Sequence, residues 1–338
     1  MKAVRYYGPN KPMKLEEISR PEPGHGDVVV KIAASGICHT ELHFLSGLLN
    51  LGVAPLVLGH EIAGTVEAVG PGVDKSLEGT RVIVYYYAGC GNCEHCLVGD
   101  ENLCNNLRAE YGFISDGGFA EYVKAPARNV VPLPENISFE QAAPIGCSVT
   151  TAIHASKLAN IKLGDTVLVY GIGAVGYGIV QLAHLAGANV IGVGRTAAKL
   201  VLAGELGADY VIDSAKENAA EKVRDITHGR GADAIFELVA TKETMDISMK
   251  SIAKRGRLVF IGYSQDSFMV HPIQLVITEA SVSGSVGNTL EELIESVRLV
   301  SEGKIKTVVD RTLKLEQFQD GIDALSAGKA IGRIILKP

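Results

Sequence analysis

Regular alternation of strand-like and helix-like segments between residues 149 and 287 is the feature that most constrains the fold of this chain. The runs TVLVY, NVIGV, DYVID, DAIFE and RLVFIGY are short and apolar, and stretches with helical periodicity separate them. Because parallel strands need crossover connections, this β-α-β order predicts a parallel sheet covered by helices. We therefore expect residues 149–287 to form one α/β domain.

The segment Gly171-Ile-Gly173-Ala174-Val175-Gly176 directly follows the first of these strands and opens a helix. Gly171 allows a tight turn, Gly173 lets the backbone approach a pyrophosphate, and Gly176 allows the helix to pack closely on the strand. The amide groups at the start of the helix would face the phosphates. The segment therefore predicts a doubly wound Rossmann-type domain that binds a dinucleotide. A glycine turn without a ligand is the alternative.

The end of the second strand, Gly194-Arg195-Thr196, indicates which dinucleotide is bound. A site for NAD usually carries an acidic residue there, which binds the 2′-hydroxyl of the ribose. Glycine followed by arginine accommodates a 2′-phosphate instead. NADP is therefore the favoured cofactor. The alternative is that Arg195 is a solvated surface residue and that NAD is used as well.

Four cysteines in GCGNCEHCLVGDENLC are spaced so that four thiolates can surround one ion: Cys90, Cys93, Cys96 and Cys104. Tetrahedral Zn²⁺ accepts four sulfur ligands, and such a site has no open position for chemistry. We expect this zinc to be structural. The alternative, a knot of disulfides, requires an oxidising compartment, and the N-terminus carries no export signal.

Outside the α/β region, short β-rich runs broken by Gly and Pro are typical of a mainly antiparallel β-domain. They include DVVVKIAAS, TRVIVYYY and AEYVKAP, and further short strands follow a helix near the C-terminus. The chain is thus expected to form one domain from residues 1–148 and 288–338, with residues 149–287 inserted as the second.

Composition excludes several classes of partner. The 338 residues carry a formal net charge of −6, without the basic stripe that nucleic acid or an anionic membrane requires. The start of the chain lacks a continuous apolar segment, and no later stretch of about 18 uncharged apolar residues occurs. We expect a cytoplasmic protein that binds neither nucleic acid nor membrane.

Five motifs in one order resemble the zinc-dependent medium-chain alcohol dehydrogenases. They are Cys38 within GICHTELH, His60 within GHEIAG, the four-cysteine segment, Gly146-Cys147, and the glycine motif, and together they cover essentially the whole chain. The resemblance implies a GroES-like β catalytic domain beside the Rossmann domain. It also implies a second, catalytic zinc on Cys38, His60 and Cys147, with Glu61 beside the metal and one position open. For each ligand alone, a buried Cys or a satisfied His is the alternative.

The same resemblance implies roles for residues around the two sites. Thr40 and His43 fall on the positions of a proton relay, and Glu41 on that of a carboxylate that orients the ligand histidine. Thr151 resembles a residue at the nicotinamide face, and Arg333 one that approaches the cofactor phosphates. Two positions restrict what is carried over: His39, where some relatives have an arginine on the pyrophosphate, and Tyr86, where relatives have an aromatic wall of the substrate pocket.

An open zinc beside a nicotinamide implies reversible hydride transfer between a primary or secondary alcohol and NADP or NAD, with an aldehyde or ketone as the product. The alternatives are a reductase of a conjugated or thioester-linked substrate on the same scaffold, and a catalytically silent nucleotide-binding protein. Polyol relatives usually have glutamate in place of the third metal cysteine, and quinone reductases lack the zinc ligands. The segment ASVSGSVG resembles the strand through which relatives dimerise, so a homodimer or a dimer of dimers is expected.

Overall fold

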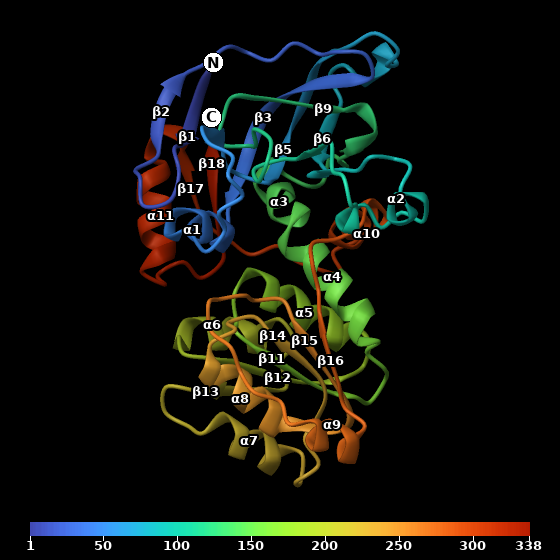
Figure 1. Cartoon of the computed structure of the whole chain (residues 1–338), viewed down its shortest axis with the longest axis vertical. Helices are drawn as coiled ribbons and strands as arrows, with labels where there is room; N and C mark the ends of the chain where they lie inside the picture. The colour runs from blue at the N-terminus through green and yellow to red at the C-terminus, as the bar shows by residue number, and fades with distance from the viewer. The chain divides into compact units, whose positions relative to one another are not determined.

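The computed structural model describes residues 1–338 and divides into two compact units, which are shown in Figure 1. The first contains Met1–Thr150 and Asn288–Pro338, and the second contains Thr151–Gly287. The second unit is therefore an insertion within the first. None of the helices combines the length and the apolar character needed to span a lipid bilayer.

A seven-stranded sheet, mainly antiparallel, forms the framework of the first unit. Six of its strands follow the order β10-β6-β5-β3-β18-β17, and β9 also pairs with β3. Gly64 of β5 packs against β3 so closely that a Cβ there would lie 2.1 Å from the carbonyl oxygen of Lys31. Only glycine fits this pairing. The strands are β3 (Asp27–Ile37), β5 (Glu61–Val69), β6 (Arg81–Val84), β9 (Tyr122–Pro126), β10 (Val130–Pro132), β17 (Val309–Lys314) and β18 (Arg333–Lys337).

Smaller elements complete the first unit. A three-stranded sheet has the order β2-β1-β4, and β7 pairs with β8 as a short antiparallel ladder. Buried side chains from both parts of the unit, including Tyr6, Phe44 and Ile334, form one core cluster. These elements are β1 (Lys2–Tyr6), β2 (Lys14–Glu17), β4 (Leu56–Val57), β7 (Tyr87–Ala88), β8 (Ala109–Glu110), α1 (His39–Ser46), α2 (Glu94–Leu97), α3 (Phe139–Ala142), α10 (Leu290–Ser301) and α11 (Phe318–Ser326). Helix α4 (Ser148–Ala159) begins in this unit and ends in the second.

The second unit contains six parallel strands in the order β13-β12-β11-β14-β15-β16. Helices α5 and α6 cover one face of this sheet, and α7 and α8 cover the other (Figure 1). The strand order reverses between β11 and β14, which is where ligands bind in doubly wound folds. The elements are β11 (Thr166–Tyr170), α5 (Ala174–Leu185), β12 (Asn189–Gly194), α6 (Ala197–Glu205), β13 (Tyr210–Asp213), α7 (Ala219–Ile226), β14 (Ala232–Glu237), α8 (Lys242–Ser251), β15 (Ile252–Phe260), α9 (Pro272–Thr278) and β16 (Ser281–Gly284). The predicted fold class is confirmed: a Rossmann-type sheet joined to a mainly antiparallel β-domain.

Candidate metal centres and dinucleotide site

Four side chains bring their donor atoms together in the interior of the first unit. Cys38, His60, Glu61 and Cys147 each offer one ligand atom, and these atoms all lie within 4.8 Å of one another. All four residues are buried, and Glu61 has no exposed surface. Two thiols, an imidazole and a carboxyl, gathered so closely in the buried interior, are a donor set that suits Zn²⁺. The residues therefore fit a zinc ion.

The ends of secondary-structure elements place these donors. Cys38 is the N-cap of α1 directly after β3, His60 and Glu61 stand where β5 begins, and Cys147 follows a 3-10 turn. Gly36 of β3 pairs with Glu61, and a Cβ on Gly36 would lie 1.9 Å from the Glu61 carboxylate. Glycine at this position therefore leaves the room that the glutamate side chain occupies.

Glu41 of α1 orients the buried imidazole. One carboxylate oxygen accepts a hydrogen bond from the N–H of Cys38 at 2.6 Å, and the other lies 3.4 Å from Nδ1 of His60. Because Nδ1 faces the carboxylate, Nε2 is the nitrogen left for a metal. Burial lowers the pKa of His60, but hydrogen bonds to Cys38 and Glu41 outweigh it and raise this pKa to about 10.

Arg333 of β18 pairs with Glu61. Its Nη2 lies 2.6 Å from Oε1 of Glu61 and donates a hydrogen bond to Sγ of Cys147 at 3.7 Å. Burial raises the pKa of Glu61 to about 7, although the charge of Arg333 acts in the opposite direction. This ion pair engages the carboxylate of Glu61. Cys38, His60 and Cys147 are therefore the three donors left for a metal ion. The predicted contact of Arg333 with cofactor phosphates stays a prediction.

Helix α1 carries both predicted relay residues. Thr40 is buried, with Oγ1 3.6 Å from Sγ of Cys38, whereas His43 is half-buried one turn further along. A hydrogen bond from Cys147 holds the pKa of Cys38 well below its ordinary value, although burial opposes this shift. Burial lowers the pKa of His43, and the charge of His39 acts in the same direction. His39 itself is exposed.

Aromatic rings pack against the ligand histidine. The His60 ring centroid lies 5.4 Å from that of Tyr86 and 5.1 Å from that of Phe113. Tyr86 and Phe113 stack on each other with an interplanar angle of 22°. Tyr86 is 3% exposed. The ring at the position predicted for an aromatic wall therefore contacts the metal-ligand imidazole directly.

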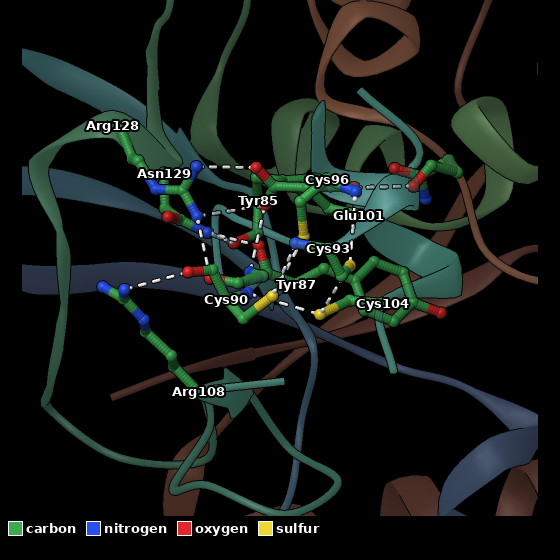
Figure 2. Close-up of polar contacts among 12 residues, drawn as sticks. Tyr85, Tyr87, Cys90, Cys93, Cys96, Glu101, Cys104, Arg108, Arg128 and Asn129 are labelled. Atoms are coloured by element: carbon green, nitrogen blue, oxygen red, sulfur yellow. Dashed lines mark hydrogen bonds and ion pairs between the residues drawn. The ribbon is translucent and has the colours of Figure 1, made fainter. Parts of the chain in front are cut away.

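The four cysteines of the lobe, residues 89–104, also converge (Figure 2). Sγ of Cys90 lies 3.9 Å from Sγ of Cys96, and Sγ of Cys93 lies 3.9 Å from Sγ of Cys104. Four sulfurs bound tetrahedrally to zinc at about 2.3 Å are about 3.8 Å apart, whereas a disulfide requires about 2.05 Å. All six cysteines of the chain are free thiols. The lobe therefore fits a zinc ion.

Backbone N–H groups face the sulfurs of the lobe. Cys93 donates to Sγ of Cys90 at 3.3 Å, Cys90 donates to Sγ of Cys104 at 3.3 Å, and Cys96 donates to Sγ of Cys93 at 3.5 Å. The bond from Cys96 contributes most to the low pKa of Cys93, about 6, while burial raises the pKa of Cys96 to about 12. N–H donors of this kind favour the thiolate form that metal binding requires.

The glycine motif of the second unit is the turn between β11 and α5. Gly171 has φ of 110°, and a Cβ on Gly176 would lie 2.5 Å from the carbonyl oxygen of Gly171. A Cβ on Gly173, the N-cap of α5, would meet no atom within 4 Å. Gly171 is thus required by its backbone conformation and Gly176 by close packing. Gly173 keeps the backbone at the N-terminus of α5 accessible to a pyrophosphate. Ala174 and Val175 form the first turn of α5.

The predicted 2′-phosphate residues stand at the end of β12. Gly194 closes the strand, Arg195 is exposed, and Thr196 is the N-cap of α6 without a hydrogen bond from its side chain to the helix. No acidic side chain occupies this strand end. Thr151, the residue predicted at the nicotinamide, is buried in α4.

Several residues at these sites were not identified from the sequence. Phe113 packs on His60, and burial raises the pKa of the nearby Glu110 to about 7. Glu101 and Arg128 contact each other beside the lobe. The acidic pair of Asp100 and Glu101 inside the cysteine segment is the one signal that could have indicated a charged partner.

Comparisons with known proteins agree with this geometry. Residues 24–135 match the alcohol dehydrogenase GroES-like domain, and residues 174–302 match the zinc-binding dehydrogenase domain. An alcohol dehydrogenase of Geobacillus stearothermophilus is 37% identical over 100% of this chain and 99% of its own length. An NAD-dependent alcohol dehydrogenase of Sulfurisphaera tokodaii is 35% identical over the full length of both chains. The crystal structure of an alcohol dehydrogenase from Aeropyrum pernix covers both chains completely, with a TM-score of 0.94 and 34% identity. The chain therefore belongs to the zinc-dependent medium-chain alcohol dehydrogenases.

Proposed function

We propose that this protein is an alcohol dehydrogenase that transfers a hydride reversibly between a primary or secondary alcohol and NADP or NAD, with NADP preferred. The observation that carries the proposal is the buried set of Cys38, His60 and Cys147, beside which Glu61 is already engaged by Arg333. Three protein ligands and one position left for substrate are typical of catalytic rather than structural zinc. The four-cysteine lobe differs, because its four thiolates fill every position of tetrahedral zinc and leave none for a substrate.

A zinc ion held by Cys38, His60 and Cys147 would lower the pKa of a bound alcohol, and a nicotinamide cofactor would supply the acceptor for the hydride. The chain's own residues hold the ion, orient the imidazole and remove the proton. Glu41 fixes His60 through Nδ1. Thr40 and His43 are three residues apart on α1 and therefore lie on the same face of the helix. The lowered pKa of His43 keeps its imidazole neutral at pH 7, in the state that accepts a proton.

The preference for NADP rests on Gly194, Arg195 and Thr196. The exposed guanidinium of Arg195 and the N-terminus of α6 both favour an anion at the end of β12. Relatives include an enzyme named NAD-dependent, so NAD remains the alternative cofactor.

A second candidate is reduction of a thioester-linked, conjugated substrate. An acryloyl-coenzyme A reductase of Sulfurisphaera tokodaii is 33% identical over the full length of both chains. The alcohol dehydrogenase function has more support, because the relatives with higher identity carry that name.

The second unit carries a candidate dimer surface. Strand β16 is an edge strand without a further neighbour, and Val282 on it and Ile273, Val276 and Ile277 on α9 are exposed. An open sheet edge beside an apolar patch is a typical site of association. We propose a homodimer through this edge, alone or as half of a tetramer.

The thiols needed for two metal centres suit the reducing cytoplasm, which we propose as the location.

Absorbance of the reduced nicotinamide tests the function. The zinc-loaded protein is assayed with NADP and NAD in parallel, on aliphatic, aromatic and cyclic alcohols and on the matching carbonyls. We expect turnover that favours NADP, stops with a chelator, and accompanies two zinc ions per chain. No turnover on this panel, with acryloyl-coenzyme A reduced instead, would favour the second candidate. Inactivity on all substrates would contradict both.

A matched pair of substitutions separates the two metal centres. Cys147→Ser removes a thiolate from the buried set, and Cys104→Ser removes one from the lobe. We expect Cys147→Ser to abolish turnover in a protein that stays folded and retains the lobe zinc. Equal effects of the two substitutions on activity and on thermal stability would contradict the division into a catalytic and a structural site.

A further inference from the structure

A short turn contacts both the four-cysteine lobe and the segment between β6 and β7 that carries Tyr86. The turn, Ala127–Asn129, lies between β9 and β10. Its last two residues point to different parts of the first unit: Arg128 contacts the lobe, and Asn129 contacts the backbone of residues 85–87 (Figure 2). Adjacent residues of one turn therefore contact both structures.

Arg128 binds the lobe through Glu101 and Gly89. Nη1 of Arg128 donates to Oε1 of Glu101 at 2.6 Å, and Nη2 donates to Oε2 at 3.2 Å and to the carbonyl oxygen of Gly89 at 3.2 Å. Oε2 of Glu101 also accepts the N–H of Gly89 at 3.1 Å. Glu101 is 8% exposed and Arg128 is exposed, so the carboxylate of this bidentate pair is buried while the guanidinium reaches solvent. Because Gly89 precedes Cys90, the pair fixes the start of the lobe.

Asn129 holds the backbone on both sides of Tyr86. The side-chain Nδ2 of Asn129 donates to the carbonyl oxygens of Tyr85 at 2.9 Å and Tyr87 at 2.6 Å. The main-chain carbonyl oxygen of Asn129 accepts the N–H of Tyr85 at 2.7 Å. Asn129 is 1% exposed. Because Asn129 is withdrawn from bulk solvent, losing these bonds would leave buried carbonyl groups unpaired. The side-chain amide of Asn129 therefore holds the peptide units that flank Tyr86, together with the N–H of Tyr111, which donates to the carbonyl oxygen of Tyr86 at 2.9 Å.

The ring of Tyr86 is the part of this segment that reaches the catalytic centre. It packs against both His60 and Phe113, which also contact each other, and its hydroxyl accepts a hydrogen bond from Nδ2 of Asn288 at 3.5 Å. Because the peptide groups on both sides of Tyr86 are hydrogen-bonded, its ring keeps one orientation against the His60 imidazole.

We propose that Asn129 is a positioning residue for the Tyr86 wall, and that through Arg128 the four-cysteine lobe influences which substrates the catalytic centre accepts. The part that concerns substrates rests on the proposed function. The part that concerns the position of Tyr86 does not.

The test is Asn129→Asp, which keeps the shape of the side chain but replaces the amide donor with a carboxylate facing two carbonyl oxygens. Asn50→Asp is the control: Asn50 is exposed, and its side-chain oxygen accepts the N–H of Gly52, as a carboxylate also can. We expect Asn129→Asp to raise KM for benzyl alcohol relative to ethanol by about fivefold to tenfold, the equivalent of one net hydrogen bond or slightly more. We expect kcat to change less than KM, and both zinc ions to be retained.

Two further measurements exclude a general loss of structure. In a Tyr86→Leu background, Asn129→Asp should no longer change the KM ratio, because effects that pass through one residue are not additive. Arg128→Gln should change the ratio in the same direction as Asn129→Asp, by a smaller factor. An unchanged ratio in folded Asn129→Asp, or an equal change in the Tyr86→Leu background, would overturn the proposal.

A readout independent of activity is available because the chain contains no tryptophan. Tyr86→Trp places a single indole at the wall. We expect Asn129→Asp to shift its emission to longer wavelength and to lower its anisotropy, and Asn50→Asp to do neither. If Asn129→Asp fails to fold, Asn129→Ser, which keeps one donor, replaces it in the same comparison. Unchanged emission would refute the positioning role, whereas inactivity of the wild-type protein with the emission shift intact would refute only the proposed function.

Discussion

Gly194→Asp is the sharpest test of how this protein chooses its cofactor. A Cβ at position 194 would lie 3.4 Å from Cδ2 of Leu200 and 3.6 Å from Cβ of Ile172, both ordinary van der Waals distances. Gly194 is not among the glycines with positive φ, so an aspartate meets no backbone strain. We therefore expect the free energy of unfolding to change little.

The effect on cofactor preference follows from charge and hydrogen bonding. A carboxylate at the end of β12 accepts a hydrogen bond from the ribose of NAD, which contributes about 1.5–3 kcal/mol when one partner is charged. The same carboxylate repels a 2′-phosphate by about 1 kcal/mol per pair of unit charges at 4 Å in water, and by more where water is partly excluded. Together these terms amount to about 3 kcal/mol. The ratio of kcat/KM for NADP to that for NAD should fall by roughly 100-fold.

The assay measures kcat/KM for both cofactors with one saturating alcohol. Gly204→Asp is the matched control, because Gly204 is exposed on α6 and a Cβ there meets no atom within 4 Å. It introduces the same charge away from the strand end, and we expect it to change the ratio less than threefold, as for screened surface charges. An unchanged ratio in Gly194→Asp, or equal changes in both variants, would show that the 2′-phosphate is not recognised at Gly194 and Arg195.

Three further predictions concern the metal lobe, a buried carboxyl and the relay. Cys104→Ser should reduce the zinc content from two ions to one and lower the thermal midpoint, as measured by metal analysis and calorimetry; two retained ions would contradict the assignment of Cys104. Glu110 has its pKa raised by burial to about 7, so the native state binds a proton that the unfolded state releases above about pH 4.5; stability should fall as pH rises from about 4.5 to 7. Glu110→Gln should therefore be more stable than the wild-type protein at pH 8 by on the order of 1–2 kcal/mol, after allowance for partial exposure, and equally stable at pH 4 in denaturant titrations; a constant difference would exclude this carboxyl as the cause. His43→Ala should reduce turnover most at lower pH, where hydroxide is scarce, and buffer bases should restore part of it; an unchanged pH profile would remove His43 from the relay.

Local sequence patterns were sufficient for the fold of the second unit. Strands β11 to β15 each contain one short apolar run, one helix lies in each crossover between them, and the turn at Gly171 follows directly from glycine geometry, whereas the exposed β16 has no such run. Periodicity and turn chemistry act between near neighbours in sequence, so they can be recognised without knowledge of long-range contacts. The family resemblance added the ligand residues, because motifs preserve spacing as well as residue type.

Contacts between distant segments could not be predicted. The ion pair of Arg333 with Glu61 joins two strands from opposite ends of the chain, and nothing beside either residue indicates its partner. Asn129 stands next to Arg128 in an ordinary polar turn, and only the pairing of β10 with β6 brings it to Tyr85. Such contacts depend on strand register, which single positions do not encode.

The place of β18 in the sheet has a consequence for how the molecule is made. This last strand lies between β3 and β17 and supplies the guanidinium that neutralises Glu61. All three proposed ligands of the catalytic zinc precede the second unit in the chain, yet their neighbour Arg333 follows it. Domains generally fold as units during synthesis, so the inserted unit can fold while the unit that encloses it is still incomplete. The catalytic centre is therefore complete only once β18 is made, and a chain truncated before β18 would leave Glu61 without its counter-ion.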